Sequence, residues 1–456
     1  MKEIFKEYIL GTEEFISSNR IIPRLAKRKE ELAQITELLT SPKIKKGVVF
    51  VGPRRSGKTF FMLELGKIFK DTHPEKIPAY INFEDERLID KEISADSIVE
   101  SFLEVFPGKG VNEALFLLDE VHTSPNWEIF SKRLIEYYGA RVVLTGSNSK
   151  LLSSEIATSM RGRTFSLQVF PLDLKEFLRF KGFELTEKTK YLKKTKVAFK
   201  KLMEELLFYG SFPEVVLIES RTLKEETLKD YLEAIFYRDI IERFEPAARK
   251  LKATRYFRRR VFESTGSPLS VHRIFNEMKS LGYKIGKDKL YDLLEVFKDA
   301  YMVIEVPHFE SSSLKEKQKQ KKYYPVDTGL LNVMLPPGSL KEAKLFETLI
   351  ATLLVRSGHK IFYWKEYWQS GECDFVALKE PHGIYAIQAT YSLTEENLLR
   401  EIKALKQCMA KTGIKNGYIL TFEEVSPEVK KLLGAQPDQA IEAKPFYEFF
   451  LETGSS

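Results

Sequence analysis

The stretch KGVVFVGPRRSGKT, residues 46–59, joins an apolar run to a glycine-containing loop and decides the fold of the first part of the chain. Residues 46–51 predict a buried strand because most of them are β-branched or aromatic, and FFMLELGKIF beyond Thr59 has apolar residues at helical spacing. A helix that begins directly after such a loop directs unpaired backbone N–H groups and its positive dipole end at an anion. The stretch therefore predicts a phosphate-binding loop between a strand and a helix.

The residue types in this loop suit a nucleoside triphosphate bound with Mg²⁺. Glycines let the backbone close around phosphate, while Lys58 can reach the β- and γ-phosphates and Thr59 can offer its hydroxyl to the metal. ATP and Mg²⁺ are therefore the expected cofactors. The residues expected to hold the nucleotide are Gly52, Pro53, Arg54, Arg55, Ser56, Gly57, Lys58, Thr59 and Phe60.

A second apolar run ends in two carboxylates, in ALFLLDE at residues 114–120. At the carboxyl end of a parallel strand, Asp119 can hold the magnesium shell and Glu120 can polarise the attacking water as a general base. With Lys58, Glu120 is therefore a candidate catalytic residue. An acidic turn after a core strand is the alternative interpretation.

Three further runs complete a predicted sheet: AYINFED at residues 79–85, RVVLTGSNS at 141–149 and TFSLQVFPL at 164–172. Strands that alternate with helices predict a doubly wound parallel α/β sheet with the nucleotide at its carboxyl edge. Ser147 and Asn148 follow the fourth strand, where a polar group can orient water against the γ-phosphate. Capping of the loop is the alternative role for both residues.

These motifs resemble the AAA-type ATPases, which have an extra strand between the two nucleotide motifs and a polar segment like TGSNS after the fourth strand. The run MRGRT at residues 160–164 adds to the likeness. In that family an arginine after the fourth strand serves as a finger. The resemblance makes Arg161 and Arg163 candidates to stabilise transition-state charge, in cis or across the interface of a homo-oligomer. A solvated or structural arginine is the alternative.

Length and composition limit the remaining possibilities. The 456 residues predict two or three domains, and 72 Lys plus Arg against 65 Asp plus Glu leave a net charge of +7, which permits a polyanionic partner without requiring one. Two cysteines are too few for a disulfide framework. There is no signal-peptide pattern and no apolar run of membrane-spanning length, so we expect a cytoplasmic protein without a membrane partner.

We expect four parts along the chain. An ATPase core at residues 1–171 is followed by a helical lid at 172–245, because apolar residues recur there at helical spacing. A winged-helix segment is expected at 246–335 and a restriction-endonuclease-like domain at 336–456. The same order of parts resembles a group of archaeal and bacterial P-loop ATPases.

The winged-helix segment is predicted from three helices, near residues 257–264, 270–281 and 286–300, and a following pair of strands. The third helix of such a segment can enter a major groove, which makes DNA an expected partner. A protein-packing module is the alternative, because lysines on a helix are commonly only solvated. The residues expected to lead the approach to DNA are Lys284, Lys287, Lys289 and Tyr291.

The C-terminal part reads as a helix, three strands and another helix, which resembles the restriction-endonuclease-like, or PD-(D/E)xK, fold. Active members place a helical Glu, an Asp and an (Asp/Glu)-x-Lys around Mg²⁺. Here Glu347 and Asp374 take the first two positions, but Gln388 and Thr390 replace the acid and the lysine of the third motif. Gln388 could still bind the metal of a second site weakly, and Glu372 is expected to point away from it. We therefore favour a degenerate nuclease domain.

The sequence as a whole predicts an ATP-binding and ATP-hydrolysing enzyme that couples its nucleotide state, ATP or ADP, to a DNA-binding C-terminal region. One alternative is an ATP-regulated, metal-dependent nuclease. The other is a nucleotide switch that binds a protein partner.

Overall fold

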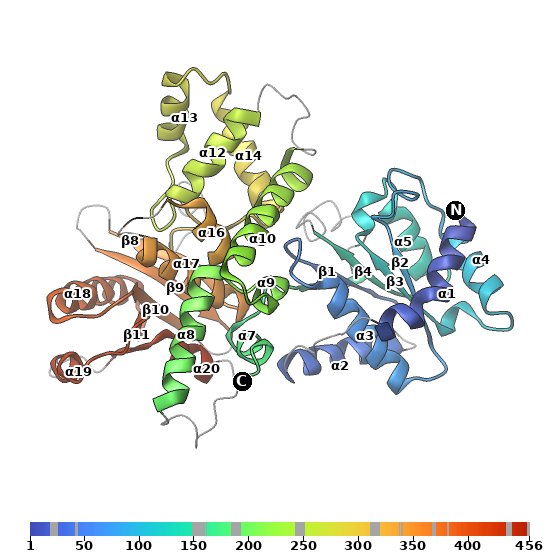
Figure 1. Cartoon of the computed structure of the whole chain (residues 1–456), viewed down its shortest axis with the longest axis horizontal. Coiled ribbons are helices and arrows are strands. Elements are labelled where there is room, and N and C mark those ends of the chain that lie inside the picture. Colours follow the sequence, from blue (N-terminus) through green and yellow to red (C-terminus); the bar gives the residue numbers. More distant parts are fainter. Residues whose placement is uncertain are drawn as a thin grey trace. The chain divides into compact units, whose positions relative to one another are not determined.

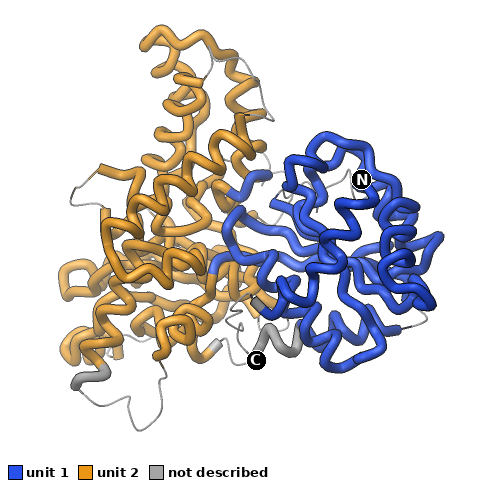
Figure 2. The backbone as a smooth tube through the Cα atoms, turned by 45° about the vertical axis from the view of Figure 1, so that its right-hand side comes forward, with its two compact units in different colours: residues 1–171, 299–301 blue, residues 172–298, 302–456 orange. Residues whose placement is uncertain are grey.

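The chain folds into two units, coloured separately in Figure 2. Unit 1 is residues 1–171 with 299–301, and unit 2 is residues 172–298 with 302–456. The computed structural model describes residues 1–18, 26–41, 44–147, 160, 162–183, 193–241, 251–310, 320–336, 338, 341–366, 371–380, 383–434 and 440–453. No helix within these ranges is long and apolar enough to cross a membrane. Two predicted site residues, Asn148 and Arg161, lie outside the described ranges.

Unit 1 is built on a five-stranded parallel sheet with the order β2-β3-β4-β1-β5 (Figure 1). Its strands are β1 (Gly47–Val51), β2 (Ile77–Asn82), β3 (Ala114–Asp119), β4 (Arg141–Gly146) and β5 (Thr164–Gln168). In the register, Gly47 pairs with Thr164 and Asn82 pairs with Asp119, so the ends of neighbouring strands lie close together. The five predicted strands and the parallel α/β sheet are confirmed.

Helices cover both faces of this sheet. Alternate residues of the strands enter two separate apolar clusters, one containing Val49 and Phe116 and the other containing Phe50 and Leu117. The strands β1 to β4 are mostly apolar because both of their faces are buried, as is usual for parallel sheets, whereas the edge strand β5 is more polar and exposed. The first cluster includes residues of α1 (Lys2–Ser18), α4 (Ala95–Val105) and α5 (Trp127–Glu136), and the second includes residues of α2 (Ala26–Thr40) and α3 (Lys58–Thr72).

Unit 2 begins with a run of helices, as predicted for residues 172–245. They are α7 (Leu174–Phe180), α8 (Lys193–Tyr209), α9 (Pro213–Leu217) and α10 (Arg221–Ala234), and a π-helical segment, Ile235–Ile241, follows. The helix α16 (Thr328–Met334) packs against α8 and α10 within the same unit. The predicted boundary at residue 171 is also a boundary between the units, whereas those at 245 and 335 fall inside unit 2.

A segment of three helices and two strands follows, which we call the hairpin segment. It consists of α12 (Leu251–Glu263), α13 (Val271–Ser280) and α14 (Lys287–Asp299), then the antiparallel strands β6 (Val303–Val306) and β7 (Lys322–Pro325). Ser270 caps α13 by accepting a hydrogen bond from the Arg273 N–H. The predicted elements are therefore present, and their arrangement as a DNA-binding winged helix stays a prediction.

The C-terminal domain of unit 2 has a mixed sheet with the order β12-β11-β10-β9-β8. β8, β9 and β10 are antiparallel neighbours, and β10, β11 and β12 are parallel. The strands are β8 (Lys360–Lys365), β9 (Glu372–Lys379), β10 (Gly383–Thr390), β11 (Asn416–Thr421) and β12 (Ile441–Pro445). The helices are α17 (Lys341–Arg356), α18 (Glu395–Thr412), α19 (Pro427–Gly434) and α20 (Phe446–Thr453). This is the predicted restriction-endonuclease-like architecture.

One buried ion pair joins three parts of unit 2. The Arg356 side chain, from α17, lies 3.1 Å from Asp327 Oδ2, and the side chains are 3 % and 1 % exposed. Asp327 precedes α16 and also accepts the Ser211 N–H, while Arg356 donates to Ser211 Oγ and to the Leu172 carbonyl. Burying both charges is tolerable because each is paired and hydrogen-bonded.

Candidate nucleotide-binding site and acid cluster

The phosphate-binding loop has the predicted strand–loop–helix form. β1 leads into Gly52, residues 53–57 form the loop, and α3 begins at Lys58 with Phe60 exposed in its first turn. A Cβ at position 52 would lie 2.1 Å from the Val169 carbonyl oxygen, so a glycine is required there. The loop therefore presents the backbone N–H groups of the α3 N-terminus at the carboxyl edge of the sheet.

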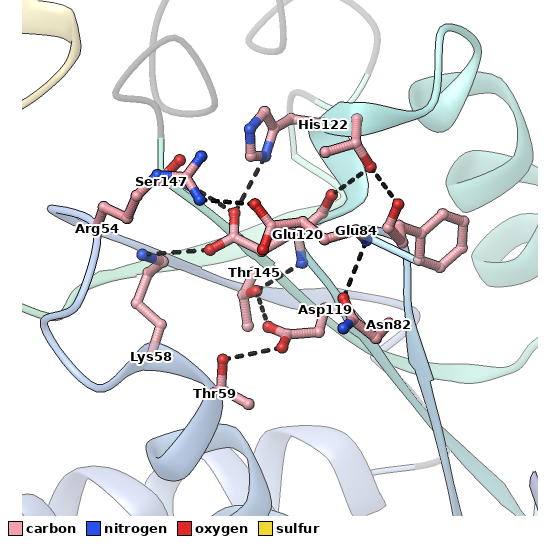
Figure 3. Close-up of polar contacts among 12 residues, drawn as sticks. Arg54, Lys58, Thr59, Asn82, Glu84, Asp119, Glu120, His122, Thr145 and Ser147 are labelled. Atoms are coloured by element: carbon pink, nitrogen blue, oxygen red, sulfur yellow. Dashed lines mark hydrogen bonds and ion pairs between the residues drawn. The ribbon is translucent and has the colours of Figure 1, made fainter. Parts of the chain in front are cut away.

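Lys58 is nearly buried and folds back over its own loop (Figure 3). Its Nζ donates to the Pro53 carbonyl at 3.0 Å and to the Gly52 carbonyl at 3.2 Å, and lies 3.5 Å from Glu120 Oε1. A carboxylate thus balances the ammonium charge. An incoming phosphate would compete for these same donors.

Thr59, in the first turn of α3, lies next to Asp119 at the end of β3. The Thr59 hydroxyl donates to Asp119 Oδ2 at 2.8 Å, and the Tyr80 hydroxyl donates to the same oxygen at 3.0 Å. The Thr145 hydroxyl donates to Asp119 Oδ1. Burial and the negative charge of Glu120 raise the pKa of Asp119 to about 6. A hydroxyl and a carboxylate this close are oxygen ligands of the kind that Mg²⁺ takes together with phosphates, so the residues fit the metal.

Glu120 is held in a fixed position next to Lys58. Its backbone is in the left-handed region, with φ at 50°, and its N–H donates to Thr145 Oγ1 at 2.9 Å. Its Oε2 accepts the Ser147 N–H at 3.1 Å and lies 3.2 Å from His122 Nδ1. Burial alone would raise the pKa of Glu120, but Lys58, His122 and Arg54 together outweigh it and lower the pKa below its ordinary value. The carboxylate is therefore ionised and can accept a proton.

Two hydroxyls at this site are buried without a hydrogen-bond partner among the described residues: Ser56 Oγ in the loop and Ser147 Oγ after β4. A buried hydroxyl without a partner is costly, so an incoming group that bonds it is favoured. The Ser147 N–H donates to the Glu120 carboxylate, and the water-orienting role of Ser147 stays a prediction. The unsatisfied Ser56 hydroxyl suits a phosphate oxygen.

Sequence reasoning missed the partner of Arg54. The Arg54 Nη1 donates to Glu84 Oε1 at 2.6 Å, and the Glu84 N–H donates to Asn82 Oδ1 (Figure 3). Glu84 follows β2 in the run AYINFED, which the sequence predicts only as a strand. The carboxyl ends of parallel strands meet at one edge of the sheet. The acids after β2 and the loop after β1 therefore lie at the same edge, and this rule could have predicted the contact of Arg54 with Glu84.

The structure does not bring Arg163 to the phosphate-binding loop. Arg163 precedes β5, and its carbonyl accepts the Gly47 N–H at the amino end of β1. Its side chain pairs with Glu136 at the end of α5. This is the edge of the sheet opposite the nucleotide site, so within one chain Arg163 is not positioned as a finger.

A cluster of acidic side chains lies in the C-terminal domain. Glu347 of α17, Asp374 of β9 and Gln388 of β10 line one cavity of about 660 Å³, as the resemblance implied. The expectation that Glu372 points away was wrong: residues 372 and 374 differ by two, so they share a face of β9, and Glu372 lines the same cavity. Glu401 of α18 was not predicted and lines it as well.

Comparisons with known proteins agree with this architecture. The family described as AAA domain matches residues 45–178, a domain of unknown function matches 200–341, and the family described as restriction endonuclease matches 341–449. The uncharacterized protein MJ1544 of Methanocaldococcus jannaschii is 34 % identical over 456 residues, which cover 99 % of this chain and 96 % of that protein. The chain belongs to the family of that protein. It is an AAA-type ATPase with a C-terminal restriction-endonuclease domain.

Other similarities are weaker. An uncharacterized protein of Haemophilus influenzae is 26 % identical over 372 residues, 81 % of this chain and 87 % of that protein. Among solved structures, the Walker-type ATPase paby2304 of Pyrococcus abyssi has a TM-score of 0.43 and 16 % identity over 67 % of this chain and 95 % of its own. The Aeropyrum pernix ORC1 protein in complex with DNA has a TM-score of 0.32 and 13 % identity over 74 % and 97 %.

The four predicted DNA-contact residues of this ATPase lie at and just before the start of α14, and all four are exposed. Lys287 Nζ lies 5.9 Å from the centre of the Tyr291 ring, and Lys289 Nζ lies 3.7 Å from Asp292 Oδ2. The opposite side of α14 packs into the hairpin segment through residues such as Leu290 and Phe297, which are fully buried. The lysines thus occupy the solvated face of the helix.

Proposed function

We propose that this ATPase binds ATP with Mg²⁺ between the phosphate-binding loop and the ends of β3 and β4, and that unit 2 couples the nucleotide state to bound DNA. The observation that carries the ATP-binding part is the pair of neighbouring contacts Thr59–Asp119 and Lys58–Glu120, at 2.8 and 3.5 Å. Thr59 and Asp119 would hold Mg²⁺, which would neutralise the negative charge that develops on the phosphate.

The hydrolytic step follows from the contacts of Lys58. Binding of the γ-phosphate draws the Lys58 ammonium away from the Gly52 and Pro53 carbonyls and from Glu120. Glu120 then orients a water molecule and accepts its proton. The water oxygen attacks the γ-phosphorus as the bond to the ADP oxygen breaks. Ser147 holds Glu120 through its backbone N–H and offers its hydroxyl to the same region.

The DNA-binding part is supported by the exposed face of α14. Lys284, Lys287 and Lys289 are exposed within a short stretch, and a helix face of this kind suits contacts to backbone phosphates. Such contacts read no sequence and weaken steeply with salt. An arginine finger that acts in trans would require a homo-oligomer, which is part of the proposal. A cytoplasmic location is also proposed, and the two free cysteines are consistent with it.

The test measures ATP hydrolysis by the full chain with and without single-stranded, duplex and branched DNA. Lys58→Ala serves as the inactive control. A charge-reversal variant carries Glu at positions 284, 287 and 289, and its matched control carries Glu at the exposed positions Lys415, Lys430 and Lys431 of the same unit. We expect DNA to stimulate hydrolysis in the wild type and in the matched control, and not in the charge-reversal variant.

DNA affinity gives an independent readout in the same proteins. Each lysine that contacts a phosphate adds about 0.9 to the slope of log affinity against log salt, so the charge-reversal variant should lose up to about 3 from that slope. Hydrolysis that is indifferent to every DNA would reject the DNA-coupling part of the proposal. A switch that binds a protein partner would then be favoured.

A further inference from the structure

A lysine from outside the restriction-endonuclease domain lies inside its acid cluster. Lys322, the first residue of β7 in the hairpin segment, has a side chain that is 0 % exposed. Its Nζ lies 2.8 Å from Glu372 Oε1, 3.3 Å from Glu347 Oε1 and 3.9 Å from Asp374 Oδ1. One ammonium group therefore sits among three carboxylates.

We propose that Lys322 is the resident cation of this cluster: its ammonium takes the place that a divalent metal has in an active nuclease of this fold. The cluster is then an internal ionic lock between the hairpin segment and the C-terminal domain. It does not act as a centre for DNA cleavage. This inference is independent of the proposed coupling to DNA.

The remaining contacts of the carboxylates support a closed cluster. Tyr324, which shares a face of β7 with Lys322, donates its hydroxyl to Glu347 Oε1 at 2.6 Å. Lys365 donates to Glu372 Oε2 at 2.7 Å, and the Ala389 N–H donates to Asp374 Oδ2 at 3.0 Å. Protein donors thus reach all three carboxylates.

The side chains around the cluster do not complete the ligand set of a metal ion. Gln388, which stands at the acid position of the third motif, has its Oε1 turned to the Asp374 backbone N–H at 3.4 Å. Within the described ranges, no three or more His, Cys, Asp or Glu side chains are arranged to hold a metal ion. The donor set therefore departs from that of a metal-dependent nuclease.

Lys322 is also poorly placed to act on a substrate. It is not among the residues that line the cavity, whereas Glu347, Glu372 and Asp374 are. A lysine that stabilised a scissile phosphate would have to reach into that cavity. Its ammonium is instead enclosed by the carboxylates and lies 5.4 Å from the centre of the Tyr363 ring. The geometry suits a structural counter-charge.

The charge of Lys322 is stable in this position. Three carboxylates within 3.9 Å of its ammonium compensate the cost of burying this charge. Gly266, just after α12, also contributes to the fit, because a Cβ there would lie 2.6 Å from Glu347 Oε2. The hairpin segment thus surrounds Glu347 with a cation, a hydroxyl and a close backbone approach.

The test counts Mn²⁺ ions bound by the full chain without nucleotide, by electron paramagnetic resonance of the free ion. Four proteins are compared: the wild type, Asp374→Asn, Lys322→Ala and the double variant. We expect the wild type and Asp374→Asn to bind the same number of ions. We expect Lys322→Ala to bind one more, and the double variant to lose it. Lys365→Ala, which removes an exposed cation from Glu372, should gain none.

DNA integrity is followed in the same samples. A wild type that binds one Mn²⁺ more than Asp374→Asn would overturn the proposal, and so would DNA cleavage that depends on both Lys322 and Asp374. The first outcome does not require the Lys322→Ala protein to fold, because it compares only the wild type with Asp374→Asn. If Lys322→Ala is unfolded, Lys322→Arg should fold and bind as many Mn²⁺ ions as the wild type.

Discussion

Replacing Glu120 by Gln separates two roles that the nucleotide site assigns to one carboxylate. The change keeps the size of the side chain and removes its charge. Glu120 lies 3.5 Å from Lys58 Nζ and is the acid that balances this buried lysine. We therefore expect the variant to bind ATP more tightly and to hydrolyse it far more slowly.

The size of the binding effect follows from the distance. Two unit charges 3.5 Å apart interact by about 5 kcal/mol at an effective dielectric constant of about 20. ATP must overcome this attraction when it takes Lys58 from Glu120, and it also meets repulsion from the carboxylate. If only a fifth of the interaction, about 1 kcal/mol, opposes binding, its removal tightens the affinity about fivefold.

The size of the catalytic effect follows from the role of a general base. Loss of a positioned base slows a proton-transfer step by about 10² to 10⁴-fold. The assay combines single-turnover release of phosphate with an affinity measured by a fluorescent ATP analogue. Glu84→Gln is the matched control, because Glu84 is an acid at the same edge of the sheet that contacts Arg54. Its hydrolysis should not show a comparable loss.

Two results would refute this reasoning. Hydrolysis by the Glu120→Gln protein within a few-fold of the wild type would show that another group, or no base at all, accepts the proton. An affinity for ATP that falls would show that Glu120 does not compete with phosphate for Lys58.

Three further outcomes are expected. Arg356→Met leaves Asp327 buried without its cation, so unit 2 should lose about 3–5 kcal/mol of stability, measured by calorimetry with the transition of unit 1 as internal control; a loss under about 1 kcal/mol would mean that the pair is solvated. Glu305→Gln should lower stability by about 1–3 kcal/mol near neutral pH, because it removes a carboxylate that is paired with lysines. Burial alone would raise the pKa of Glu305, but these lysines hold it below the ordinary value. That difference should vanish as the pH falls through the lowered pKa, since the wild-type carboxylate is then protonated too, and a difference that persists in acid contradicts the electrostatic cause. Gly52→Ala should abolish nucleotide binding, because its Cβ would lie 2.1 Å from the Val169 carbonyl oxygen; retained affinity in a titration would show that the loop can move away.

The strands of unit 1 and the phosphate-binding loop could be predicted because their signals are local. The strands β1 to β4 are mostly apolar runs of five or six residues, and the loop combines its glycines and Lys58 within eight residues between a strand and a helix. Asp119 and Glu120 follow from the same logic, since they end an apolar strand. The contact of Lys58 with Glu120 joins two such local signals, which meet because parallel strands share one carboxyl edge.

The acid cluster could be predicted only in part, because its decisive contact is not local. Lys322 lies in the run KKYYPVD, where a lysine at a strand end resembles any solvated lysine. Its three partners come 25 to 52 residues later in the chain, on α17 and β9. The spacing of these three acids in the sequence does not predict that β7 lies next to them. The error over Glu372 was different, because the two-residue period of a strand does place it with Asp374.

Two of the buried lysines, Lys58 and Lys322, have the same chemistry and opposite surroundings. Lys58 faces one carboxylate at 3.5 Å and two backbone carbonyls, so a triphosphate with several negative charges can outcompete its partners. Lys322 faces three carboxylates within 3.9 Å, and no single anionic ligand replaces all of them without leaving buried acids uncompensated. The first arrangement therefore suits exchange of a ligand in each cycle, and the second suits a permanent contact. If that difference is correct, ATP should shift the environment of Lys58 while Lys322 stays inaccessible to amine-reactive reagents in every nucleotide state.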